Sequence, residues 1–265
     1  MKKLFGAILM VLIGGNCVNA EQILPQEIVQ ITQTIEVPKT GEKGKWYFYC
    51  SNGKKCSTED VVRDYYQNNG YKAMRAEVSF WQAMFALAFF DEIFYNHEFE
   101  QTLIKKPDKE PFLFCINDIP RGFFAGDFLY LERKKMYDEK YKFLKQANIY
   151  EYINSQIEKY GDAPTRILRE TEENRDCIDY FKTPIVQEFL KRINPETFAT
   201  ITYQIAKNPR DNRAGTPDFI VWNNEELILV EVKREKETLR DGQIVWIEFL
   251  LKNKIPAIVM RVKGI

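Results

Sequence analysis

Histidine is almost absent from this sequence, because His97 is the single one among 265 residues. Mechanisms that need two histidines, or a histidine base beside histidine metal ligands, are therefore excluded. His97 lies in the charged stretch YNHEFE, and we expect it at the surface. With one histidine in the chain, the pair Cys50 and Cys56 gives little support to a zinc finger.

The chain also lacks a net charge, since 38 lysines and arginines balance 38 aspartates and glutamates. No overall basic field indicates a polyanionic partner, so nucleic acid would need a local basic patch. The apolar run LFGAILMVLIGG is too short to span a membrane comfortably. It follows MKK and precedes VNA, which is typical of a signal peptide that is removed after Ala20.

We therefore expect residues 1–20 to be a signal peptide and the mature protein to be periplasmic or secreted, without stable membrane association. An uncleaved membrane anchor is the alternative. Four cysteines would remain, an even number that suits an oxidising compartment: Cys50, Cys56, Cys115 and Cys177. The turn between the first two favours a small disulfide-closed loop, whereas four free thiols in the cytosol are the other interpretation.

The overall composition is globular, with 45% hydrophobic and 14% aromatic residues. Local patterns predict a helix-rich body followed by a strand–strand–helix–strand unit, which is an α/β domain at the end of a helical body. Helices are expected at about 58–67, 74–95, 131–160, 163–181, 195–207 and 239–253. Strands are expected at about 45–50, 219–222, 227–230 and 256–262, with a polar lead-in at 21–44 and a loop at 208–217.

Two carboxylates adjoin the apolar C-terminal strands, Asp218 before FIVW and Glu231 after LILV. If residues 223–226 form a hairpin loop, Asp218 lies opposite Glu231, with β-carbons roughly 4.5–5.5 Å apart. Lys233 then points to the same face as Glu231, about 6.6 Å further along the strand. Val232 points away into the core.

Opposed like charges destabilise a sheet unless another group compensates them. A hard divalent cation with oxygen ligands, Mg²⁺ or Mn²⁺, would do so, and it could orient a water and stabilise charge on a phosphodiester. Lys233 offers three donors and a point charge to the water or the phosphate. The pattern predicts metal-assisted phosphodiester hydrolysis, and a structural Asp–Lys–Glu ion-pair cluster is the competing interpretation.

Basic residues flank this unit on both sides, and they could neutralise phosphates despite the neutral total charge. The residues expected to contact DNA are Lys207, Arg210, Arg213 and Arg234. A solvated charged loop is the alternative for each of them.

The stretch TPDFIVW…LVEVKREKETLRDGQIVWIEFL resembles the VRR-NUC branch of the PD-(D/E)XK nucleases. The motif positions are occupied by Pro217, Asp218, Glu231, Val232, Lys233, Gln243 and Trp246. A second stretch, YYQNNGYKAMRAEVSFWQAMFALAFFDEIF, is similar to a buried helix of the Fanconi-associated nuclease subgroup that starts with a glutamate between glycines. Here Ala76 and Val78 replace those glycines around Glu77. The resemblance covers roughly residues 58–95 and 184–265.

This resemblance implies an α/β fold with a restriction-endonuclease-like PD-(D/E)XK core, in which helices flank a central mixed sheet, and a helix-rich N-terminal and middle region. A nuclease domain would span 58–265, with a helical insertion at about 96–183 and a catalytic core at about 184–265, after an N-terminal extension at 21–57. The implied metal ligands are Glu77, Asp218, Glu231 and the Val232 carbonyl. Lys233 would be the catalytic lysine and Gln243 a supporting polar group.

The family is metal-dependent and cleaves DNA with flap- or junction-like structure, or trims it from a 5′ end. We therefore expect an exported Mg²⁺- or Mn²⁺-dependent deoxyribonuclease with DNA as its partner and no nucleotide cofactor. Two alternatives stay open, a cytoplasmic repair nuclease acting on flaps or branched DNA, and an inactive nuclease-like DNA-binding module. The helix-spaced aromatics are expected in the core rather than against bases: Trp81, Phe85, Phe89 and Phe90.

Overall fold

The fold is described from a computed structural model of the chain. The structure describes residues 25–42, 45–76, 78–105, 110–168 and 177–265. The predicted signal peptide and Glu77, the predicted third carboxylate ligand, lie outside these ranges.

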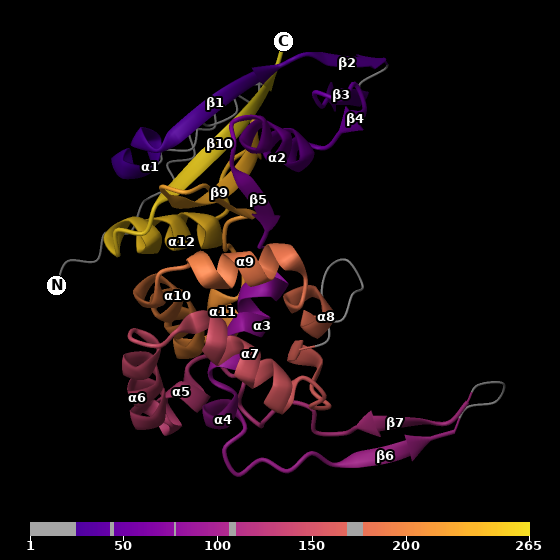
Figure 1. The fold of residues 1–265 in the computed structure, drawn as a ribbon, viewed down its shortest axis with the longest axis vertical. Coiled ribbons are helices and arrows are strands. Elements are labelled where there is room, and N and C mark those ends of the chain that lie inside the picture. The colour runs from indigo at the N-terminus through magenta and orange to yellow at the C-terminus, as the bar shows by residue number, and fades with distance from the viewer. Residues whose placement is uncertain (1–24, 43–44, 77, 106–109, 169–176) are drawn as a thin grey trace, which may run out of the picture.

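A five-stranded mixed sheet forms the upper half of the molecule in Figure 1. Its strands, in spatial order, are β1 (Thr32–Val37), β10 (Ala257–Gly264), β9 (Leu227–Arg234), β8 (Phe219–Trp222) and β5 (Lys72–Arg75). The first three run parallel, and β8 is antiparallel to both β9 and β5. Strands β8 and β9 are buried almost throughout, which explains their unbroken apolar runs.

Helices cover both faces of this sheet. Helix α2 (Thr58–Asn68) packs on one face, where its valines meet Val230 and Val232. Helix α12 (Asp241–Lys252) covers the other face together with the short helix α1 (Gln26–Gln30). Because side chains alternate along a strand, Glu231 and Lys233 point toward the α12 face.

The lower half of the molecule is a body of helices around the apolar helix α3 (Val78–Ala88), as Figure 1 shows. Its other helices among the described residues are α4 (Phe90–Ile93), α5 (Phe128–Glu132), α6 (Lys134–Leu144), α7 (Ile149–Tyr160), the 3-10 helix η1 (Arg166–Leu168), α8 (Cys177–Phe181), α9 (Pro184–Arg192), α10 (Pro195–Lys207) and α11 (Pro209–Asn212). Helix α3 packs against α7 and α10. The predicted core aromatics are confirmed as buried.

Two small sheets lie outside the central one. Strands β2 (Lys39–Glu42), β3 (Lys45–Tyr49) and β4 (Lys55–Cys56) form an antiparallel sheet, and a disulfide joins Cys50 to Cys56, in agreement with the expected loop. Strands β6 (Gln101–Ile104) and β7 (Phe112–Cys115) form a hairpin that projects from the helical body (Figure 1).

The predicted helices α2, α10 and α12 and the predicted strands β3, β8, β9 and β10 are confirmed as elements. Local capping decides several of their ends. The side chain of Asn194 accepts hydrogen bonds from the amides of Glu196 (2.8 Å) and Thr197 (3.3 Å), so α10 begins where the sequence indicates.

The single long helix predicted at about 74–95 is wrong. Residues Lys72–Arg75 form β5, and the helix that follows is divided at Phe89 (φ −115°, ψ 25°) into α3 and α4. Residues Lys72–Arg75 form a strand because of a tertiary contact. One edge of β8 pairs with β9, and the backbone groups on its other edge find their hydrogen-bond partners in β5.

Other differences are smaller. The predicted helix at about 163–181 is wrong in part, since the described residues there are helical only in η1 and α8, and the loop at 208–217 contains α11. Strands β1, β2, β4, β6 and β7 were not predicted. His97 is half-buried rather than at the surface, with its Nε2 2.8 Å from the Asn117 carbonyl oxygen. None of the helices in the described ranges has the length and hydropathy needed to cross a membrane.

Candidate active site

The register of the β8–β9 hairpin decides whether the predicted carboxylates meet. The paired residues run from Trp222 with Leu227 to Phe219 with Val230, which is the predicted register. The side chain of Asn223 closes the loop by accepting hydrogen bonds from the amides of Glu225 (2.8 Å) and Glu226 (3.0 Å). Extending this register by one position beyond Phe219 and Val230 brings Asp218 opposite Glu231.

Asp218 lies immediately before β8 and is held from two sides. Its Oδ2 accepts a hydrogen bond from the Val232 amide (2.7 Å), and its backbone carbonyl accepts one from the Ala76 amide (2.9 Å). The first bond ties the carboxylate to β9 and the second ties the backbone to the chain that continues from β5. Asp218 therefore has a defined place beside Glu231.

Glu231 is the most buried carboxylate of the site, with 1% of its surface exposed. Its Oε1 accepts hydrogen bonds from Lys233 Nζ (2.6 Å) and from Gln243 Nε2. Its Oε2 is buried and has no hydrogen-bond partner among the described residues. A buried carboxylate oxygen without a donor is costly, so this atom is suited to a cation.

The electrostatics of the site agree with that interpretation. Burial, followed by the negative charge of Asp218, raises the pKa of Glu231 to about 8, although Lys233 opposes the change. Burial also raises the pKa of Asp218, while the Val232 amide and Lys233 lower it. Two carboxylates in one desolvated place resist ionising together unless a positive charge joins them.

Lys233 is buried with 4% of its surface exposed, which is rare for a lysine without a partner. Its Nζ lies 2.6 Å from Glu231 Oε1 and 3.7 Å from Glu237 Oε1. The ammonium is thereby held beside the carboxylate pair, on the face of the sheet that α12 covers.

Gln243 lies in the first turn of α12 and is buried. Its Oε1 accepts a hydrogen bond from the Arg240 amide (2.9 Å), while its Nε2 donates to Glu231. The side chain both caps the helix and contacts the carboxylate. The supporting role of Gln243 in catalysis remains a prediction. One turn further along, Trp246 Nε1 donates to the Asn212 carbonyl (3.1 Å), so α12 is also tied to the loop that precedes Asp218.

The oxygen donors present fit a hard cation such as Mg²⁺ or Mn²⁺. Asp218 and Glu231 converge, and one oxygen of Glu231 has no protein donor among the described residues. Within the ranges that the structure describes, no three His, Cys, Asp or Glu side chains are close enough to hold a metal ion together. The predicted third carboxylate, Glu77, lies outside those ranges, and the Val232 carbonyl remains a predicted ligand.

The four residues predicted to contact DNA flank the site in the sequence, three before Asp218 and one after Lys233. Arg213 lies over the Phe124 ring (5.1 Å to the centroid) and Lys207 over the Tyr203 ring (4.9 Å). Arg210 is exposed in α11. Arg234 follows Lys233, and its Nε donates to Thr58 Oγ1 at the start of α2 (3.1 Å). DNA binding by these residues remains a prediction.

Sequence reasoning missed two carboxylates near the site. Glu59 of α2 adds to the raised pKa of Asp218, and Glu237 contacts the ammonium of Lys233. The helix was expected from about residue 58, and in the structure Ser57 and Asp60 form a capping box at its start. No local signal indicated that this end of the helix approaches β9.

Two glycines let α12 approach the loop before Asp218. Gly215 has φ +93°, and a β-carbon there would lie 2.5 Å from the Gly242 carbonyl carbon and 2.8 Å from the Gln243 nitrogen. A β-carbon on Gly242 would meet only the Ala214 carbonyl oxygen at 3.5 Å and atoms further away. The close approach therefore requires glycine at 215 and tolerates a side chain at 242.

We expect Gly215→Ala to lower the free energy of unfolding by roughly 2 kcal/mol, since alanine is strained at positive φ and its methyl group would displace the α12 backbone. Displacing Gln243 from Glu231 should also reduce the activity of the site by about 10- to 100-fold. Gly242→Ala is the matched control, and its stability should stay within about 1 kcal/mol of the original chain. Urea unfolding of both variants checks this, and equal stability of the two would contradict it.

Asp218, Glu231 and Lys233 lie together at one end of a mixed sheet, and the fold is of the PD-(D/E)XK nuclease type. Residues 152–264 match the family model described as the VRR-NUC domain. The match begins within α7, upstream of the catalytic core expected from about 184.

The chain is similar to the Fanconi-associated nuclease 1 homologue of Caenorhabditis elegans, with 30% identity over 217 residues, and to that of Caenorhabditis briggsae, with 27% over 217 residues. These matches cover 78% and 79% of the chain, and the chain spans 23% of the length of either relative. A crystal structure of paFAN1 bound to 1-nucleotide 5′ flap DNA with a gap has a TM-score of 0.67 at 18% identity, covering 93% of this chain and 40% of that one.

Proposed function

We propose that this protein is a divalent-metal-dependent nuclease that hydrolyses DNA phosphodiester bonds in flaps or branched DNA. The observation that carries the proposal is the buried Glu231 carboxylate, which lies beside Asp218 and Lys233 and has one oxygen without a donor among the described residues. Glu92, which pairs with Lys140 in the helical body, also has a buried oxygen without a donor among the described residues. The neighbouring carboxylate of Asp218 is therefore what distinguishes Glu231 as a cation ligand.

The relatives support the substrate class. The similar proteins are named Fanconi-associated nucleases, and the similar crystal structure holds 5′ flap DNA. Branched DNA therefore fits this chain better than the general degradation of exported DNA. Export itself stays a prediction from residues 1–20, which the structure does not describe, and it is not part of this proposal.

Asp218 and Glu231, with Glu77 and the Val232 carbonyl as further predicted ligands, are the residues that would hold Mg²⁺ or Mn²⁺. When bound, such a cation would lower the pKa of a water and stabilise charge on the phosphate. Asp218 is kept in place for this by the Val232 amide. Gln243 and Lys233 both donate to Oε1 of Glu231, which orients the carboxylate and leaves Oε2 to face the cation.

Lys233 has a second task in this proposal. Its buried ammonium carries three hydrogen-bond donors, and Glu231 accepts one of these hydrogen bonds. The remaining donors can bind a phosphate oxygen or hold the attacking water as the phosphodiester gains charge. A carboxylate oxygen of Glu237 lies 3.7 Å from the same ammonium.

The test is cleavage of labelled 5′-flap, single-stranded and duplex DNA by the full chain with Mg²⁺, Mn²⁺ or chelator. We expect cutting only with a cation and fastest on the flap substrate. Cutting that persists in chelator would contradict the metal requirement, and equal rates on all three substrates would contradict the preference for branched DNA. Binding without cutting under any metal would favour the inactive DNA-binding module.

The raised pKa of Glu231 predicts that cation binding releases a proton. With a pKa of about 8 in the metal-free protein, the carboxyl is mostly protonated at pH 7 and must ionise before it can bind a cation. Affinity for Mn²⁺ should therefore fall by about tenfold per pH unit below 8 and level off above it. For the same reason, the metal-free chain should lose stability as the pH rises from about 4.5 to 8, because the folded state holds the extra proton.

Isothermal titration with Mn²⁺ in two buffers of different ionisation heat counts the released protons. We expect about one at pH 7 and almost none at pH 9.5. The Glu231→Gln variant is the control and should release none from this position. A proton count that does not change between these two pH values would show that another group governs cation binding.

A further inference from the structure

The outer face of the β2–β3–β4 sheet exposes two tyrosines. Tyr47 and Tyr49 of β3 are each 38% exposed, whereas Phe48 between them is buried against the α2 side of the central sheet. Alternation along the strand therefore places both phenol rings on one solvent face.

One lysine lies beside these rings, and a second lies in the adjoining turn. Lys55 pairs with Tyr49 across β3 and β4, and its Nζ lies 4.4 Å from the centre of the Tyr47 ring. Lys54 precedes it in the turn and is exposed. We call the surface made of Tyr47, Tyr49, Lys54 and Lys55 the tyrosine–lysine face. It combines aromatic planes with positive charge.

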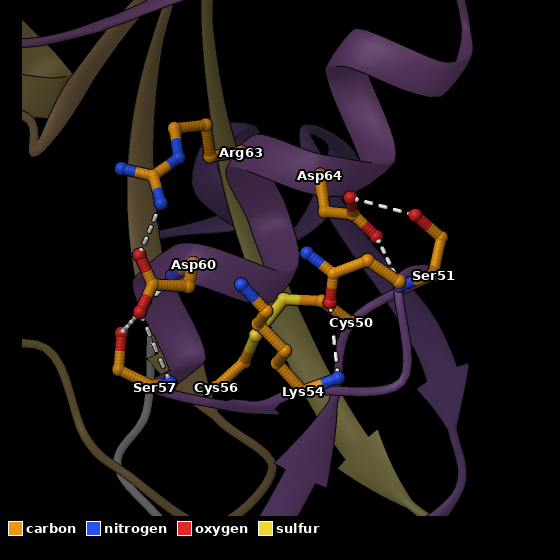
Figure 2. The surroundings of a disulfide bond; sticks show 9 residues. Cys50, Ser51, Lys54, Cys56, Ser57, Asp60, Arg63 and Asp64 are labelled. Atoms are coloured by element: carbon orange, nitrogen blue, oxygen red, sulfur yellow. Dashed lines mark hydrogen bonds and ion pairs between the residues drawn. A yellow bond between two sulfur atoms is a disulfide. The ribbon is translucent and has the colours of Figure 1, made fainter.

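The tyrosine–lysine face is held rigid by the turn that connects its strands. The disulfide between Cys50 and Cys56 closes this turn (Figure 2). Both carboxylate oxygens of Asp64 on α2 accept hydrogen bonds from Ser51, from its amide at 2.7 Å and from its hydroxyl at 2.9 Å. A surface of this kind binds without losing much conformational entropy, because its backbone is already ordered.

The chain continues from this sheet directly to the candidate active site. Cys56 is followed by the N-cap Ser57 and by Thr58, whose hydroxyl accepts a hydrogen bond from Arg234 (3.1 Å). Arg234 is the residue after Lys233. On the other side, the Lys39 amide at the start of β2 donates to the Ile265 carbonyl (3.1 Å), just beyond the end of β10. Strands β10 and β9 are parallel, so this end of β10 is also the catalytic end of β9.

We propose that the tyrosine–lysine face is a binding site for single-stranded DNA, with bases stacked on Tyr47 and Tyr49 and phosphates beside Lys54 and Lys55. The proposal rests on the proposed function, since this site would take an unpaired strand of the DNA that the active site cleaves. Base stacking on aromatic side chains beside lysines is how proteins bind single strands without sequence preference.

The spacing of the rings favours a single strand over a duplex. Positions two apart on a strand are separated by about 6.6 Å, roughly twice the 3.4 Å rise per nucleotide of one strand in duplex DNA. Two neighbouring bases can stack on the two rings, one on each, only if they move apart from their stacked arrangement in the duplex. The bases of an unpaired strand can do so at little cost. Duplex DNA could contact only the lysines.

Fluorescence anisotropy with a labelled oligothymidine, in chelator so that no cutting occurs, tests this on the full chain. Replacing both tyrosines, Tyr47→Ala with Tyr49→Ala, should weaken single-strand binding by about 30-fold or more, while duplex binding changes little. The pair Tyr47→Phe with Tyr49→Phe keeps the rings and should stay within about threefold. Replacing Lys54 and Lys55 with alanine should reduce the salt slope by about 0.7 for each of the two lysines that neutralises a phosphate.

A matched control removes two exposed tyrosines elsewhere, Tyr65→Ala with Tyr95→Ala, and should leave single-strand binding unchanged. Unchanged binding by the Tyr47→Ala, Tyr49→Ala chain, with thermal unfolding like that of the original, would overturn the proposal. If the Tyr47→Ala, Tyr49→Ala chain binds the oligothymidine as before and also cuts flap DNA normally, the nuclease function stands and the single-strand site fails. If the original chain binds the oligothymidine through these tyrosines but cuts nothing, the single-strand site stands and the nuclease function fails.

Discussion

Asp218→Asn should abolish cleavage, lowering its rate by about 10³-fold or more, because the variant loses a charge that a cation needs while keeping its shape. An asparagine oxygen can still accept the hydrogen bond from the Val232 amide, so the fold should be retained. Glu231→Gln should have an effect of the same size. Gln243→Ala, which removes a group that only orients Glu231, should cost about 10- to 100-fold.

The measurement is single-turnover cleavage of 5′-flap DNA with Mn²⁺, together with Mn²⁺ affinity by calorimetry. The control is Glu248→Gln, which changes an exposed carboxylate of α12 and should leave both values unaltered. Asp218→Asn with full activity would remove Asp218 from the site. The contacts predict that cleavage rate and Mn²⁺ affinity fall most for the Asp218 and Glu231 variants and less for the Gln243 variant.

Phe85→Ala should lower the free energy of unfolding by about 3–5 kcal/mol. Phe85 is fully buried in α3, and its ring lies 5.6 Å from that of Phe89 and 6.1 Å from that of Phe123. Removing it leaves a cavity where α3 meets the rest of the helical body, and the tightly packed neighbours can refill that space only in part.

Urea unfolding followed by circular dichroism measures this effect as a lower midpoint with an unchanged slope. Tyr95→Ala is the matched control, since Tyr95 is 51% exposed just beyond α4, and it should change stability by no more than about 0.5 kcal/mol. A small effect of Phe85→Ala, combined with weaker DNA binding, would mean that the aromatics of α3 contact DNA, contrary to their burial.

The candidate site was largely predictable because its central part is a hairpin. The loop length decides which residues pair, and strand alternation decides which side chains share a face, so Asp218, Glu231 and Lys233 could be brought together from their spacing. The place of Gln243 followed from a family resemblance and not from spacing. Its contact with Glu231 depends on where α12 lies against the sheet.

The β5 strand shows why the rest could not be predicted. Residues 72–75 precede a long apolar run, and the helix predicted at about 74–95 includes the last two of them. Their pairing with β8 depends on an unfilled sheet edge that is more than 140 residues away in the chain. The pairing of β1 with β10, near opposite ends of the described chain, is non-local in the same way.

The sequence by itself determined the caps and turns, the buried strands, the hairpin register and the two carboxylates and lysine that it aligns, because each follows from interactions between residues close in the chain. Only the tertiary structure decided how deeply Glu231 is buried, which of its oxygens lacks a donor among the described residues and how high its pKa rises. It also decided that the β2–β3–β4 sheet adjoins the end of β9 that carries Glu231 and Lys233. Burial and desolvation depend on every element that packs around a group, and the order of residues along the chain does not contain that arrangement locally.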